Sequence, residues 1–250
     1  MRIRLVFIIT VCGLISCTAN LELKKKQEHS LKNFGAQHFI NRNYTGALTQ
    51  LLEAEKIYSK DPELHNALGL TYMKVGKPDL AIRHLKKALF LNPDYSYARN
   101  NLGAAYMEKQ EWDRAIACFQ TLLKDILYNT PHIARSNLAF AYYHKKSYKL
   151  AEYYYNEALS INPEYIRALH GLGLTFMALG KYQAAVDCVE KAVKITPDIL
   201  ELRFDLANAL VKADKKTEAV LIYRELIRLD KNGLFAEKAE KAIQNLGIKF

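Results

Sequence analysis

The sequence predicts an all-α protein, a solenoid of six helix-turn-helix repeats followed by one further helix. The main observation is a series of alanines spaced 34, 34, 36, 34 and 34 residues apart, with a second series of small residues twelve positions ahead of it. A fixed period of 34 is typical of helical repeats, and small residues are needed where the two helices of a repeat cross closely. The alanines are Ala47, Ala81, Ala115, Ala151, Ala185 and Ala219, and the series ahead of them is Gly35, Gly69, Gly103, Ala139, Gly173 and Ala207.

Larger residues repeat with the same period. A leucine immediately precedes the small residue of the first helix in five repeats, and a large residue follows each alanine of the second helix by four positions. Residues three or four apart share one face of a helix, so these positions form an apolar stripe. Proline after Asn92, Asn162 and Thr196 is expected to end the second helix of three repeats.

This pattern resembles the tetratricopeptide repeat (TPR) family, in which Leu-Gly, Tyr, Ala, Phe or Tyr, Ala and Pro recur in this order. The resemblance implies a right-handed TPR superhelix with six repeats over residues 28–233. Residues 234–250 are expected to form a capping helix and a tail, because a terminal repeat must have its apolar face covered. The repeats are expected to begin near Glu28, Pro62, Ser96, His132, Ile166 and Leu200.

The first residues resemble a bacterial lipoprotein signal peptide. Two arginines precede an apolar stretch, Leu5 to Ile15, that would rise about 16 Å as a helix, too short for a bilayer core of roughly 30 Å. The four residues that end at Cys17, Leu-Ile-Ser-Cys, resemble the lipobox, in which the cysteine is lipidated and becomes the first mature residue. We expect a signal peptide at residues 1–16, and a lipidated N-terminus with a short linker at residues 17–27. The alternative is an ordinary signal peptide in which Cys17 is incidental.

The resemblance to a lipoprotein signal also predicts where the protein is located, and it helps to interpret the net charge of the chain. Thr18 stands where inner-membrane lipoproteins of many Gram-negative bacteria carry Asp, which favours a lipid anchor in the outer membrane, facing the periplasm. The net charge is +10, but lysines alternate with acids along the chain, and the only basic run, Lys24-Lys25-Lys26, lies near the lipidated end. A basic balance of this kind indicates solvated helix faces and not a nucleic-acid partner.

The sequence contains no motif of an enzyme or a metal site. Its seven histidines are scattered, with no HExxH and no Cys/His cluster at metal-ligand spacing. Neither a GxSxG elbow nor a phosphate-binding glycine loop is present. Cys118 and Cys188 stand two repeats apart, and a disulfide needs Cα atoms within about 7 Å, so we expect both to be free. We expect a non-enzymatic protein with no metal, no small-molecule substrate and no cofactor beyond the covalent lipid on Cys17.

The period is broken once, where the alanine spacing grows by two and the extra residues fall within 124–131. A tolerated loop insertion is one reading, since solenoids accept insertions easily. The segment is also similar to the third-to-fourth repeat junction of the type IV pilus biogenesis lipoproteins of the PilF/PilW family. The residues that carry this resemblance are Tyr128, Thr130, Pro131, Ala134, Asn137 and Leu138.

The resemblance to that family implies a pilotin, which binds the secretin subunit and uses its lipid to bring the subunit to the outer membrane for ring assembly. Two other functions stay open. One is a general envelope TPR lipoprotein that tethers cell-wall hydrolases or other envelope complexes. The other is a ligand-binding or enzymatic module on a lipid anchor.

A partner protein is expected to bind in a groove lined by the first helix of each repeat. Methionine occupies one equivalent position in three repeats, and flexible methionines are common on surfaces that adapt to a partner. We expect an amphipathic or extended segment held by apolar contacts, with Asn66, Asn100 and Arg167 setting its register. The predicted groove residues are Asn66, Leu70, Met73, Tyr97, Asn100, Met107, Phe140, Tyr143, His144, Arg167, His170, Leu174 and Met177.

Overall fold

The computed structural model describes residues 2–247, with side chains from residue 20 onward. Over this range the chain forms thirteen helices and no strand, which confirms the predicted all-α fold class. The chain divides into two units, residues 1–118 and 119–250. The helices that begin in the first unit are α1 (Arg2–Ile40), α2 (Tyr44–Ile57), α3 (Pro62–Lys74), α4 (Pro78–Leu91), α5 (Ser96–Glu108) and α6 (Trp112–Leu122).

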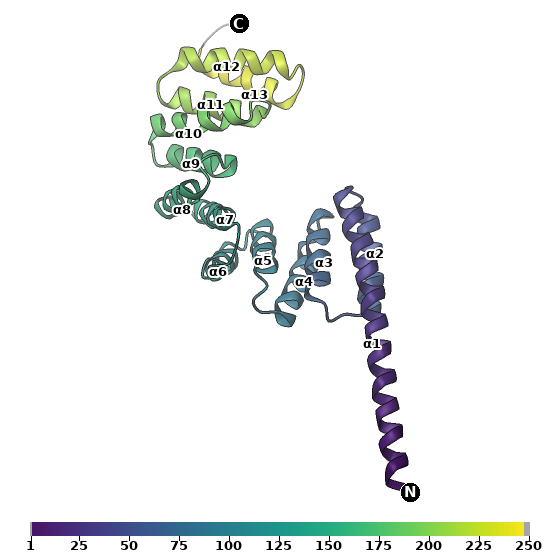
Figure 1. Cartoon of the computed structure of the whole chain (residues 1–250). Coiled ribbons are helices and arrows are strands. Elements are labelled where there is room, and N and C mark those ends of the chain that lie inside the picture. The colour runs from purple at the N-terminus through teal and green to yellow at the C-terminus, as the bar shows by residue number, and fades with distance from the viewer. Residues whose placement is uncertain (1, 248–250) are drawn as a thin grey trace. The chain divides into compact units, whose positions relative to one another are not determined.

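In the first unit, α1 packs against α2 and α3 against α4 as helical hairpins, and α5 packs against both α3 and α4 (Figure 1). The long helix α1 begins at Arg2, so residues 17–27, where a linker was expected, are helical. This segment contains neither proline nor glycine and includes alanine, leucine, glutamate, lysine and glutamine, which favour a helix. No helix in the described part of the chain is long and apolar enough to cross a membrane.

The second unit repeats the hairpin arrangement three times and ends with a single helix (Figure 1). The last helix packs against α11 and α12 and buries Ala236, Ala239 and Ile243, as a capping helix should. The helices are α7 (Pro131–His144), α8 (Tyr148–Ile161), α9 (Ile166–Ala178), α10 (Tyr182–Ile195), α11 (Leu200–Lys212), α12 (Lys216–Leu229) and α13 (Leu234–Asn245).

The small residues lie where the two helices of each repeat cross. All six alanines of the first series are fully buried. A methyl group added at Gly69 would lie 2.5 Å from the side chain of Leu85, and one added at Gly173 would lie 2.4 Å from Val189. Because real Cβ atoms do not approach so closely, the period of 34 reflects a steric requirement of the helix crossing.

The turn between the two helices of a repeat is also conserved in geometry. One residue in each turn has a positive φ, between 58° and 72°, and it stands seven positions after the small residue of the first helix. Only two of these six residues are glycine, the residue that adopts this conformation most readily. The six are Arg42, Gly76, Gln110, Lys146, Gly180 and Asp214.

The insertion in the period appears as a longer connection, residues 123–130, before α7. The corresponding connections at 58–61, 92–95, 162–165 and 196–199 are half as long. Tyr128 is buried in this loop at 7% exposure, whereas its neighbours Ile126 and Leu127 are 95% and 86% exposed. The Asp125 carboxylate accepts a hydrogen bond from the Leu127 backbone N–H at 2.9 Å, which holds the turn.

Candidate partner-binding surface

The predicted groove residues all lie on first helices, and none is fully buried. In the first unit they belong to α3 and α5, and in the second unit to α7 and α9. Tyr97, Phe140, His144 and Arg167 are exposed, and the other nine are partly buried. Each unit therefore presents a row of accessible side chains along adjacent first helices, although the role of these residues in binding stays a prediction.

The asparagines of the first unit have a structural use. The Asn101 side-chain amide donates to the Asn66 carbonyl oxygen at 2.8 Å, and the Asn66 amide donates to the Tyr95 hydroxyl at 3.5 Å. These bonds join α3 to α5 and the turn before it, so the Asn66 side chain connects neighbouring repeats. A partner that uses Asn66 must share or replace these bonds.

The second unit contains an equivalent contact, between a histidine and an aspartate. His170 Nε2 on α9 lies 2.7 Å from a carboxylate oxygen of Asp205 on α11. The two residues are 35 positions apart, as are Asn66 and Asn101, so the same register of the repeat is used in both units. His170 was predicted from the sequence, whereas Asp205 and Asn101 were not. A sequence signal for these two residues exists, because each follows its partner, Asn66 or His170, by one repeat plus one residue.

The exposed face of α7 is aromatic and uncharged. The Phe140 and His144 rings have centroids 4.3 Å apart, and the Tyr143 ring lies 5.4 Å from His144 and 5.6 Å from Tyr148. Burial lowers the pKa of His144 below its ordinary value. Burial is also the largest cause of the raised pKa of Tyr143, so both rings are neutral at neutral pH. Neutral aromatic clusters of this kind suit apolar contacts with a partner protein.

The methionines lie between the core and the surface. Met73, Met107 and Met177 are each partly buried, and Met177 packs against the apolar cluster that includes Leu206 and Leu210. A methionine in such a position can shift without opening a cavity, because its side chain is unbranched. This placement is compatible with both core packing and partner contact.

Several accessible or clustered residues were not anticipated from the sequence. Ile126 and Leu127 form an exposed apolar pair on the long loop of the second unit. The histidines of the first unit are also less scattered than their spacing indicated, because His65 and His84 meet beside Glu55. The histidine grouping depends on which turn of one helix faces its neighbour, and sequence spacing alone does not show this.

The sequence predicts two kinds of cysteine, free thiols in the repeats and a lipidation site near the N-terminus. Cys118 and Cys188 are free and partly buried, as expected, and burial raises the pKa of each thiol, to about 11 for Cys118. The predicted lipidation site, Cys17, falls on α1, but its side chain lies outside the described residues. Lipidation there stays a prediction.

Comparison with solved structures shows the same fold in type IV pilus proteins. The crystal structure of PilW, a widely conserved type IV pilus biogenesis factor, has a TM-score of 0.73 at 22% identity and covers 82% of this chain and 95% of PilW. The structure of PilF from Pseudomonas aeruginosa has a TM-score of 0.75 at 17% identity and covers 88% of this chain and 99% of PilF. At these identities the likeness concerns the fold.

Sequence comparison identifies relatives and repeat families that match this chain. BBSome complex member BBS4 of Bos taurus is 26% identical over 179 residues, which are 72% of this chain and 34% of that protein. The chain spans about a third of the length of the first curated relatives that it matches. One tetratricopeptide repeat model matches residues 66–126 and 170–233, half of the chain, and a second matches residues 130–198. The chain therefore belongs to the tetratricopeptide repeat family.

Proposed function

We propose that the protein is a non-enzymatic TPR scaffold, anchored by a lipid on Cys17 to the periplasmic face of the outer membrane. Its proposed role is that of a pilotin-like factor, which binds a secretin subunit and delivers it for assembly in type IV pilus biogenesis. The observation that carries the proposal is the reciprocal coverage of PilW and PilF, since almost the whole of each of those chains matches. The lipobox-like residues before Cys17 support the anchor.

The accessible rows on the first helices supply a surface for the partner. Half-buried methionines and the aromatic face of α7 favour an apolar or amphipathic segment over a charged peptide. A stable lipid anchor needs more than one acyl chain, and bacterial lipoproteins that resemble this one carry several.

The test is affinity purification of the full-length protein from membranes of its own host. The affinity tag is placed at the C-terminus only, and the secretin is detected by immunoblotting. We expect the secretin to co-purify with the wild-type chain and to be lost when Met73→Glu and Met107→Glu are combined. Phe90→Glu is the matched control, because Phe90 is a 77% exposed apolar residue on the second helix α4 of the same unit.

Cys17→Ser tests the anchor separately. We expect this variant to lose its lipid, as measured by intact mass, and to leave the membrane fraction. Capture of a cell-wall hydrolase in place of a secretin would support the general envelope adaptor instead. If the double methionine variant captured the secretin as well as wild type does, the first-helix surface would not be the binding site.

A further inference from the structure

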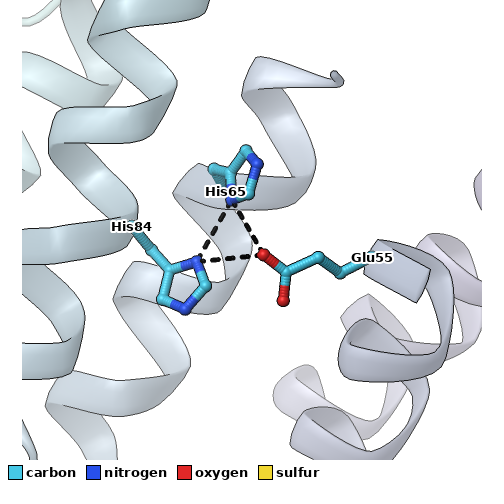
Figure 2. A group of neighbouring side chains, drawn as sticks. All are labelled: Glu55, His65 and His84. Carbon is cyan, nitrogen blue, oxygen red and sulfur yellow. Dashed lines mark hydrogen bonds and ion pairs between the residues drawn. The ribbon is translucent and has the colours of Figure 1, made fainter. Parts of the chain in front are cut away.

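Three potential metal ligands converge in the first unit, on three consecutive helices. Glu55 comes from α2, His65 from α3 and His84 from α4, and Figure 2 shows a carboxylate oxygen and two ring nitrogens turned toward one another. His65 Nδ1 lies 3.1 Å from His84 Nδ1 and 3.7 Å from Glu55 Oε1, and His84 Nδ1 lies 3.8 Å from Glu55 Oε1. The His65 and His84 side chains are 3% and 13% exposed.

The hydrogen bonds around His65 define which of its nitrogens is available. His65 Nε2 lies 2.9 Å from the Ser59 carbonyl oxygen. A carbonyl oxygen only accepts, so Nε2 carries the hydrogen and Nδ1 keeps its lone pair toward His84 and Glu55. A backbone carbonyl that orients a histidine in this way is typical of metal sites, where it sets the tautomer of the ligand.

The other ring is held by packing. The His84 ring lies against the Tyr72 ring, with centroids 5.3 Å apart and planes at 17°, and its centroid is 5.4 Å from that of His65, with planes at 25°. Two imidazole nitrogens that face each other at 3.1 Å need a shared proton or a cation between them. If a cation is bound, the hydrogen of His84 moves to its Nε2, and no net proton release is required from this ring.

The separations match the bond lengths of Zn²⁺. A triangle with sides of 3.1, 3.7 and 3.8 Å has its centre about 2.1 Å from each corner, which matches the Zn–N and Zn–O bond lengths of about 2.0–2.2 Å. We propose that Glu55, His65 and His84 form a Zn²⁺ site that joins the first two repeats. Two imidazoles and one carboxylate suit Zn²⁺, whereas Mg²⁺ and Ca²⁺ prefer oxygen ligands alone.

Three protein ligands leave a fourth position of a tetrahedral ion open for water or an external group. Glu55 is 29% exposed at its side chain, so the cluster is accessible from solvent on the α2 side. Because the ligands come from α2, α3 and α4, a bound ion ties the second helix of the first repeat to both helices of the second. The ion is therefore expected to stabilise the first unit.

The test uses the full chain, without a histidine tag, in detergent and freed of metal by a chelator. Co²⁺ alone serves as the first probe, because tetrahedral Co²⁺ gives intense visible d–d bands, and Zn²⁺ titration by calorimetry is the second. We expect one ion per chain. Excess Zn²⁺ at about 100 times Kd should raise Tm by roughly 5–10 °C, because the ion binds only the folded state.

Ligand variants identify the site. Loss of an orienting contact in a metal site weakens binding about 10–100-fold, so we expect His84→Gln and Glu55→Gln, which each remove a direct ligand, to reduce affinity by more than that. Both side chains are partly accessible, and the folded fraction of each variant is checked by circular dichroism. His144→Gln is the matched control, since His144 is an exposed histidine of the second unit.

Two results would overturn the proposal. One is the absence of Co²⁺ bands and of a Zn²⁺-dependent rise in Tm in the wild-type chain, which would leave a hydrogen-bonded histidine pair. The other is binding that survives in His84→Gln, or that shows the ultraviolet thiolate bands of a cysteine-bound Co²⁺ ion. Neither result would affect the proposed role in secretin assembly, because secretin capture is measured independently.

Discussion

The first and last repeat junctions of the molecule are stabilised by different chemistry. At the first, Lys32 on α1 forms ion pairs with Asp61 and Glu63, and Glu28 is buried beside them. The apolar cluster there has only four buried residues. At the last, α10 to α13 share a cluster of twelve buried residues, none of them charged. Burial of apolar area supplies stability that depends little on pH, whereas buried charges make a junction sensitive to pH and to the loss of one partner.

The largest effect is expected where the apolar junction is broken. Leu226 is fully buried among α11, α12 and α13, and Leu226→Ala should lower the free energy of unfolding by about 2–5 kcal/mol through lost burial and a cavity. Urea denaturation followed by circular dichroism measures this change. Leu229→Ala is the matched control, because Leu229 lies one turn away and is 51% exposed, so its effect should be within about 0.5 kcal/mol. Equal effects of the two variants would contradict the assigned core.

An intermediate effect is expected where the polar junction loses its cation. The Lys32 and Asp61 side chains are only 11% and 15% exposed, so Lys32→Met leaves a carboxylate in a poorly solvated place. We expect a loss of about 1–3 kcal/mol, less than for a fully buried pair. Adding Asp61→Asn to Lys32→Met should recover part of the loss, because the asparagine removes the charge and can still cap α3. A double variant less stable than the single one would show that charge burial is not the cause.

The smallest effect concerns pH. The pKa of Glu28 is raised to about 7, mainly by burial and next by the nearby charge of Asp61, while the charge of Lys32 opposes the shift. The folded chain therefore holds a proton that the unfolded chain releases above an ordinary value of 4.5, and stability should fall as pH rises from about 4.5 to about 7.

Glu28→Gln tests this dependence, because glutamine cannot ionise. We expect the variant to be more stable than wild type at pH 8 by about 1–2 kcal/mol, allowing for solvent screening, and nearly equal at pH 4.5. Glu22→Gln, at a 63% exposed side chain of the same helix, is the control and should leave the pH profile unchanged. Parallel pH profiles for wild type and Glu28→Gln would contradict the raised pKa.

The fold could be predicted closely because the repeat carries its own internal check. The small residues recur six times, and each marks the same helix crossing, so an error in one repeat would be visible in the others. The starts of the first helices could also be predicted, since α3 begins at Pro62, α9 at Ile166 and α11 at Leu200, as expected. The continuous α1 was not anticipated, because a signal-like motif and a linker were inferred from resemblance and not from helix propensity.

The site residues were less predictable, since their partners lie on other helices. His65 was one of seven scattered histidines, and only the packing of α2, α3 and α4 brings it to Glu55 and His84. Asp205 is a further example, because its pairing with His170 follows from the repeat register but only one of the two residues was selected. Sequence periodicity defines which positions are equivalent, whereas side-chain pairing depends on residues that differ between repeats.

The six turns with positive φ have a consequence for how such an array diverges over evolutionary time. The backbone conformation recurs at all six places, yet glycine occupies only two of them, Gly76 and Gly180. Each of the other four side chains costs its turn on the order of 1 kcal/mol relative to a relaxed backbone. A loss of this size in one repeat is shared with well-packed neighbours, so substitutions at the turns can accumulate without unfolding the chain. The six repeats therefore share the position and conformation of the turn more closely than the residue that occupies it.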